Sequence, residues 1–175
     1  NGVDEEFLRT NRLELSGLAK GYESAEQVWA ALQADPTLVV IDNFSVDRTG
    51  DPTFQVDEDA FLVRSIGASD ATFDAVPLSI VGQDGMAREF TIIGVLSSAP
   101  SFYGAMMSED SAAQLGYGGS AGTLAARRYF VRLPEGADAR AAANALESAF
   151  SRSGLQTSLL KEQLAESRSS INSIF

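Results

Sequence analysis

The chain has 175 residues, no cysteine and no histidine, and 24 acidic against 13 basic residues, which gives a net charge of −11. This composition excludes serine–histidine and cysteine–histidine nucleophiles and zinc sites built from cysteine or histidine. The negative charge argues against nucleic-acid binding, because a phosphate backbone would be repelled.

The first clear element is a helix that leads into a buried strand. Residues 1–21 are mixed and polar and carry no clear pattern. Ser24 and Gln27 have the spacing of a capping box, and the Asp-Pro pair at Asp35 ends the helix that they begin. The apolar run at residues 38–41 then has the length and composition of a buried strand. The helix face expected in the core consists of Ala25, Val28, Trp29 and Leu32.

The clearest strand signal is a hairpin in the middle of the chain. A loop over residues 42–59 and a short strand over 60–66 precede it. Residues 77–81 and 88–96 are strand-like, and the Gly-Gln-Asp-Gly sequence between them tolerates positive φ. Gly94, inside the second strand, predicts a bulge or a close approach of another backbone.

The C-terminal part predicts alternating strands and helices. Residues 102–107 and 128–133 are expected strands, and Ser108 caps a short helix between them. Asp138 caps a longer helix that runs to about Ser153 and ends at a glycine.

The last segment predicts an amphipathic helix. Residues 155–159 form a short expected strand, and residues 159–175 follow as a helix without a closing Gly, Asn or Pro. Its apolar stripe consists of Leu160, Leu164, Ile171, Ile174 and Phe175. The whole order predicts an α+β fold with helices packed on a mostly antiparallel sheet. We expect a single domain over residues 1–175, made of two small subdomains, with room for an inserted subdomain around residues 42–100.

Three segments contain residues that are typical of binding sites. The acidic residues 57–59 lack the order of a calcium loop, and the glycine-rich residues 116–122 lack the strand and helix that flank a dinucleotide-binding loop. The third is a candidate apolar contact surface for a lipid or a hydrophobic peptide, with ordinary core packing as the alternative. It consists of Phe102, Tyr103, Met106 and Met107. The sequence therefore predicts no catalytic residue, no cofactor, no metal site and no enzymatic activity.

Several segments resemble one family of membrane proteins. The run Phe90-Thr91-Ile92-Ile93-Gly94-Val95-Leu96, after a glycine-containing hairpin, resembles a strand in the extracytoplasmic domain of ABC transporter permeases of the MacB/FtsX/LolCE type. The run Tyr129-Phe130-Val131-Arg132-Leu133 and the alanine-rich helix after Asp138 resemble the elements that follow there. Gly21-Tyr22, Val28-Trp29-Ala30-Ala31-Leu32 and Asp35-Pro36 resemble a pattern of large bacterial permeases.

The resemblance implies a domain on the extracytoplasmic side of the bacterial cell membrane, as part of an integral membrane protein. It would couple the motion of a separate ABC ATPase to the movement of a lipid or peptide cargo, or to a partner protein. The final helix would be a stalk leading toward one of the protein's own transmembrane helices, with Leu160, Leu164, Ile171 and Ile174 on its apolar side. The alternatives are a stand-alone binding protein for a small hydrophobic ligand, which would use residues 102–107, and an enzyme that uses paired carboxylates alone.

Overall fold

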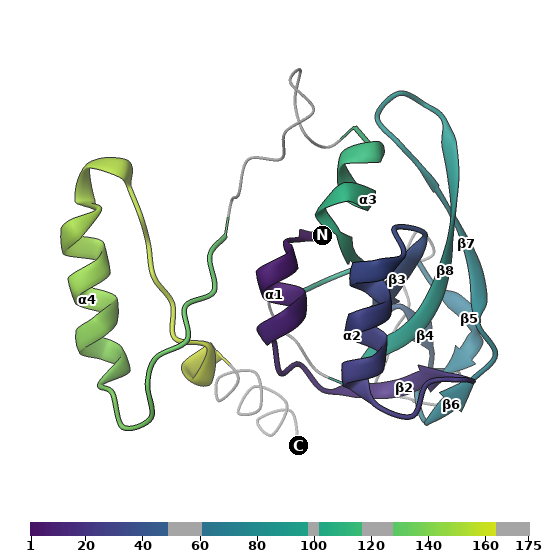
Figure 1. Cartoon of the computed structure of the whole chain (residues 1–175), viewed down its shortest axis with the longest axis horizontal. Helices are drawn as coiled ribbons and strands as arrows, with labels where there is room; N and C mark the ends of the chain where they lie inside the picture. The colour runs from purple at the N-terminus through teal and green to yellow at the C-terminus, as the bar shows by residue number, and fades with distance from the viewer. Residues whose placement is uncertain (49–60, 98–101, 117–127, 164–175) are drawn as a thin grey trace. The chain divides into compact units, whose positions relative to one another are not determined.

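The computed structural model describes residues 1–48, 61–97, 102–116 and 128–163. The chain divides into two compact units, Asn1–Arg127 and Arg128–Phe175 (Figure 1). In the described residues, the first unit contains both β-sheets and three helices, and the second unit contains α4 (Ala139–Ala149) and the short 3₁₀ helix η2 (Ser151–Ser153).

The main sheet of the first unit is mixed. Seven strands take part, in the order β1-β9-β3-β8-β2-β6, with β7 also paired to β8. The strands are β1 (Gly2–Val3), β2 (Leu15–Ala19), β3 (Leu38–Ile41), β6 (Thr72–Phe73), β7 (Val76–Val81), β8 (Ala87–Leu96) and β9 (Ala105–Ser108). A separate two-stranded sheet joins β4 (Val46–Asp47) and β5 (Val63–Gly67).

The predicted α+β class is confirmed, but the prediction of a mostly antiparallel sheet is only partly correct. β8 is antiparallel to β2 and β7 and parallel to β3. β1 and β6 pair in parallel with β9 and β2, and β4 pairs in parallel with β5. Only the β7–β8 hairpin has a local turn signal that fixes strand direction. The other ladders join segments that are distant in sequence, and the residue pattern of a strand does not tell which neighbour it will have.

The hairpin forms as predicted. β7 and β8 pair from Val76 opposite Ile92 to Val81 opposite Ala87, and Gly85 in the turn has a φ of +75°. The turn is attached to the rest of the unit, because the N–H of Gln83 donates to the carbonyl of Leu115 at 2.9 Å. Leu115 follows α3 (Glu109–Gln114), the short helix capped by Ser108.

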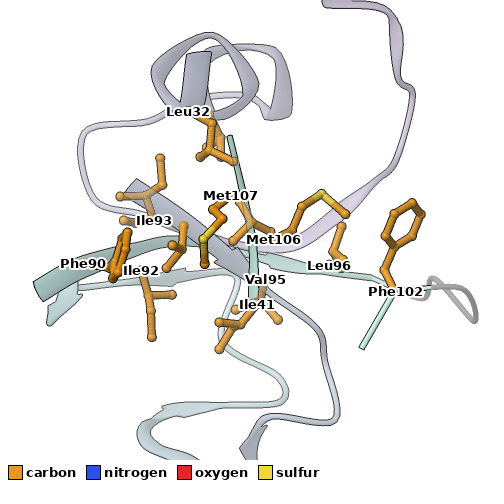
Figure 2. Packing of buried hydrophobic residues seen from close by; sticks show 14 of the residues in the cluster. Leu32, Ile41, Phe90, Ile92, Ile93, Val95, Leu96, Phe102, Met106 and Met107 are labelled. Carbon is orange, nitrogen blue, oxygen red and sulfur yellow. The ribbon is translucent and has the colours of Figure 1, made fainter. Parts of the chain in front are cut away.

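The core includes side chains of the main sheet, of α2 (Ala25–Ala34) and of the two-stranded sheet, and Figure 2 shows part of it. Ser24 caps α2 through the N–H of Gln27, as the capping-box spacing predicts. Val28, Trp29 and Leu32 are buried, in agreement with the predicted helix face. β8 is buried continuously from Ile92 to Leu96, whereas its other end, next to the hairpin turn, is more exposed. Continuous burial is typical of a strand that is covered on both faces.

Gly94 lies at a tightly packed point of the core. The pairing of β3 with β8 shifts register between Val39 and Val40, so that Val40 lies opposite Gly94. A Cβ at Gly94 would lie 3.1 Å from Val40 Cγ2 and 3.3 Å from Val28 Cγ1. The prediction of a bulge or a close approach at this glycine is confirmed.

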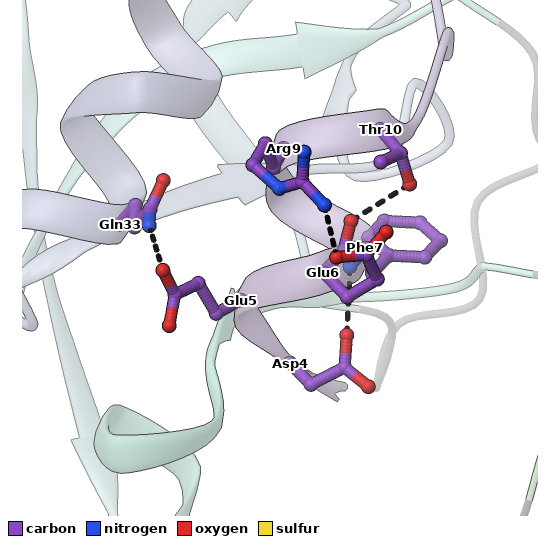
Figure 3. Close-up of polar contacts among 7 residues, drawn as sticks. All are labelled: Asp4, Glu5, Glu6, Phe7, Arg9, Thr10 and Gln33. Atoms are coloured by element: carbon purple, nitrogen blue, oxygen red, sulfur yellow. Dashed lines mark hydrogen bonds and ion pairs between the residues drawn. The ribbon is translucent and has the colours of Figure 1, made fainter.

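One helix of the first unit was not predicted from the polar N-terminal stretch. α1 (Glu5–Thr10) begins at Asp4, whose Oδ1 accepts from the N–H of Phe7 at 2.7 Å (Figure 3). Figure 3 also shows Glu5 accepting from Gln33 Nε2 of α2 at 2.8 Å. Six residues are too few to show a helical period, and an isolated helix this short is unstable in water. Contacts with α2 and the burial of Leu8 therefore account for its presence.

The second unit confirms one prediction and corrects two. Asp138 Oδ1 accepts from the N–H groups of Arg140 and Ala141, at 3.0 Å each, and Gly154 follows η2 with a φ of +69°. Residues 128–133 and 155–159 were predicted as strands, but neither belongs to a sheet of the described residues. Their residue types favour extended backbone, but a strand requires a ladder with a neighbour, which composition alone does not supply.

The predicted stalk helix is described only at its start. Residues 160–163 are helical, and Leu160 is exposed. Leu164, Ile171, Ile174 and Phe175 lie outside the described residues. Within the described ranges, no helix is both long enough and apolar enough to cross a membrane.

Candidate functional site

A group of exposed side chains lies where two parallel strands end. β3 and β8 run parallel, with Ile41 opposite Val95, so both finish at the same edge of the sheet. β9 runs antiparallel to β3 and begins there, with Ala105 opposite Ile41. The residues that follow β3 and those that precede β9 therefore meet. Carboxyl ends of strands in open sheets are also where ligands commonly bind.

A buried carboxylate joins these two loops. Asp42 is 4% exposed. Its Oδ1 accepts from the N–H groups of Phe44 and Ser45, at 2.6 and 3.0 Å, and its Oδ2 accepts from Ser45 Oγ at 3.0 Å and from the N–H of Gly104. The N–H of Asp42 donates in turn to the carbonyl of Gly104 at 3.1 Å. A buried charge is stable only when it is well hydrogen-bonded, and this carboxylate accepts four bonds.

Two aromatic rings from the loops that this carboxylate joins lie side by side. The ring centroids of Phe44 and Tyr103 are 6.1 Å apart, with planes inclined by 35°, and their residues are 48% and 63% exposed. Arg48 places its guanidinium carbon 5.2 Å from the centroid of Phe44, and its Nε and Nη2 donate to the carbonyl of Asn43 at 3.2 and 2.9 Å. We call Phe44, Arg48 and Tyr103 the aromatic patch.

Further bonds hold the backbone under the aromatic patch. Asn43 Nδ2 donates to the carbonyl of Ser97, just after β8, and Asn1 Nδ2 donates to the carbonyl of Tyr103 at 2.8 Å. Gly104 has a φ of +76°, which turns the chain sharply after Tyr103 and which other residues rarely adopt. The two rings are thus carried by loops that are fixed to each other and to the sheet.

The structure separates the four residues of the predicted apolar contact surface. Phe102, Met106 and Met107 are buried, and Figure 2 shows them among the core side chains. Only Tyr103 is exposed: it lies on the loop before β9, as does Phe102, but the ring of Phe102 packs against that of Phe7, with the centroids 5.7 Å apart. Core packing, the alternative for this segment, describes the other three. The ring next to Tyr103 comes from Phe44, some sixty positions earlier in the chain.

Sequence reasoning did not identify Phe44 or Arg48. Both lie in a segment rich in turn residues, where a single aromatic residue carries no period. The available signal was an aromatic residue three positions after a buried strand, with an Asp directly after that strand. Its meaning depends on the register of β3 with β9, which the sequence does not show.

A second feature is an open depression of about 480 Å³, lined by residues of β5, β6 and β7 and by Lys20, which follows β2. Its lining includes Lys20, Asp70 and Asp74, and Lys20 Nζ lies 2.8 Å from Asp74 Oδ1. This polar, open shape differs from the enclosed apolar cavity that usually holds a small hydrophobic ligand.

No metal-binding cluster is found in the part of the chain that the structure describes. No group of three or more acidic side chains there could hold a metal ion. The acidic residues 57–59 and most of the glycine-rich loop lie outside the described residues. The aromatic patch presents two exposed rings and a guanidinium, a geometry that is suited to contact.

Comparison with known proteins gives no match: no family model, no curated protein and no solved structure is significantly similar to this chain. Function is therefore inferred from the geometry of the chain and from its sequence resemblance.

Proposed function

We propose that this chain is the extracytoplasmic domain of a bacterial ABC transporter permease of the MacB/FtsX/LolCE type. In this role it contacts a lipid or peptide cargo, or a partner protein, outside the membrane. It couples that contact to the motion of a separate ABC ATPase through its own transmembrane helices. The domain itself performs no chemistry.

The observation that carries the proposal is the exposed apolar surface of the second unit. α4 contains no buried residue, although one side of it is lined by alanines and Leu146. Tyr129, Val131 and Phe150 are all more than half exposed. Large apolar side chains that are left exposed are available for contact with another structure. A domain joined to transmembrane helices and to further subunits offers such contacts.

The first unit supports the proposal in a different way. The hairpin and the buried strand β8, on which the resemblance partly depends, are both present, and so is the Asp138-capped helix. The described part of the unit has a buried apolar core and hydrogen-bonded loops under the residues of the aromatic patch, which suits a domain that passes on motion. The strand expected at residues 128–133, which also entered the resemblance, is absent from the sheets described.

The test is the side of the membrane on which the first unit lies. The chain contains no cysteine, so a single introduced thiol in an otherwise cysteine-free full-length protein reports one position. We would introduce Val81→Cys, at an exposed position in β7, and Val39→Cys, at a buried position in β3. Intact cells are then treated with a maleimide that does not cross the cytoplasmic membrane.

The expected result is labelling of Val81→Cys in intact cells, with Val39→Cys protected until the protein is denatured. A separate ATPase with phosphate-loop motifs should also co-purify with the full-length protein. Labelling of Val81→Cys only after cell lysis would overturn the extracytoplasmic location. Correct labelling without an associated ATPase would overturn the transporter assignment.

A further inference from the structure

We propose that the aromatic patch is the docking point for a partner protein of net positive charge, which places an apolar side chain against the rings of Phe44 and Tyr103. The proposal rests on the proposed function for its location and adds the surface and the chemistry of the contact.

The composition of the aromatic patch indicates a protein partner. Tyr, Phe and Arg are enriched where protein interfaces are energetically strongest, whereas most charged residues are depleted there. The separation of the rings, 6.1 Å, lies within the usual range for a stable aromatic pair. Together they present a broad apolar face with a guanidinium at its margin.

The hydrogen bonds below the rings make this face ready for contact. Asp42 fixes the backbone of Phe44 and that of Gly104, next to Tyr103, through one carboxylate. Because the loops are already ordered, a partner does not lose affinity by ordering them on binding. If the two rings had no role in binding, a buried carboxylate that fixes the backbone of both loops would not be needed.

The charge of the first unit indicates the sign of the partner. Of the 24 acidic residues, 19 lie in Asn1–Arg127, which contains only seven of the 13 basic residues. An acidic body attracts a basic protein and accelerates its association. It repels a second copy of the same chain, and it also repels an anionic lipid surface.

The test uses photo-crosslinking in the full-length protein in its own cells. The photoreactive residue p-benzoylphenylalanine replaces Tyr103 or Phe44, and in the matched control it replaces Val81, which is 59% exposed in the same unit. We expect one protein adduct shared by the Tyr103 and Phe44 positions and absent at Val81. That adduct protein is then purified, and its affinity for the full-length protein is measured at rising salt concentration.

We expect Phe44→Ala and Tyr103→Ala each to weaken this binding by about tenfold or more, Val81→Ala to leave it unchanged, and salt to weaken it. Several results would overturn the proposal: no adduct, an adduct with lipid, glycan or a second copy, an acidic partner, or equal binding by the alanine variants. The labelling of Val81→Cys is measured separately. A correct membrane side with no adduct therefore refutes the docking surface alone, and a cytoplasmic side refutes the proposed function.

Discussion

Replacing Asp42 by asparagine should destabilise the first unit strongly, because the two side chains have the same shape but different hydrogen-bonding groups. The carboxylate accepts from N–H groups on both oxygens, from Phe44 and Ser45 on one and from Gly104 on the other. An asparagine amide has only one acceptor atom. In either orientation, its nitrogen faces a backbone N–H that loses its partner.

The size of the effect follows from these bonds. An unpaired buried N–H costs about 1–3 kcal/mol. The hydrogen bonds that remain are then made to a neutral group and are about half as strong, which costs about a further 1 kcal/mol. We therefore expect Asp42→Asn to lower the free energy of unfolding by about 3 kcal/mol, which for a unit of this size corresponds to a fall of about 10 °C in Tm.

Unfolding can be followed with the chain's single tryptophan. Trp29 is buried on α2, so its fluorescence reports the first unit and not the second. The matched control is Asp74→Asn, which removes an exposed carboxylate paired with Lys20 at 2.8 Å. Exposed ion pairs contribute little, so this variant should unfold almost like the wild type. If Asp42→Asn and Asp74→Asn have the same midpoint, Asp42 does not bridge the loops.

Two further predictions concern Gly94 and the hairpin turn. Gly94→Ala should lower the free energy of unfolding by about 1–3 kcal/mol, because the added methyl group overpacks against Val40 and Val28. In urea unfolding, the Val40→Ala, Gly94→Ala double variant should lose less stability than the sum of the two single variants. If the two losses simply add, Val40 does not crowd position 94. The two bonds from the Arg88 guanidinium lower the pKa of Asp84 from 3.8 to about 2. Because the folded pKa lies below the unfolded one, the stability from this pair is present above about pH 4 and is lost as the pH falls toward 2. In Arg88→Gln the pKa of Asp84, read from the carboxyl carbon by NMR, should rise toward 3.8, and an unchanged value would contradict the assignment.

The elements that could be predicted from the sequence are those with local signals. Ser24 and Gln27 mark the start of α2, the Gly-Gln-Asp-Gly turn marks the hairpin, and Asp138 marks the start of α4. Each signal depends on residues within a few positions of one another. α1 escaped prediction because its cap at Asp4 is followed by too few residues to show a period.

The features that could not be predicted depend on contacts between distant segments. β3 pairs in parallel with β8, although 45 residues separate the two strands in the sequence, and no residue in either strand encodes this neighbour or its direction. The aromatic patch is a sharper case, because Tyr103 was named as a contact residue while Phe44 was not. Their rings meet only because β9 pairs with β3 in one register, with Ala105 opposite Ile41.

The two units of the chain use their apolar residues in different ways, and this difference bears on function. Among its described residues, the first unit has a buried apolar core, and the rings of Phe44 and Tyr103 are exposed on loops that Asp42 joins. A hydrophobic residue in place of Asp42 could fill the same volume, but it would not fix the N–H groups of Phe44 and Gly104 in one geometry. The second unit instead leaves one side of α4 and the side chains of Tyr129 and Val131 open. This difference suits a protein whose first unit stays rigid at its contact surface, while another structure covers the exposed apolar side chains of its second unit.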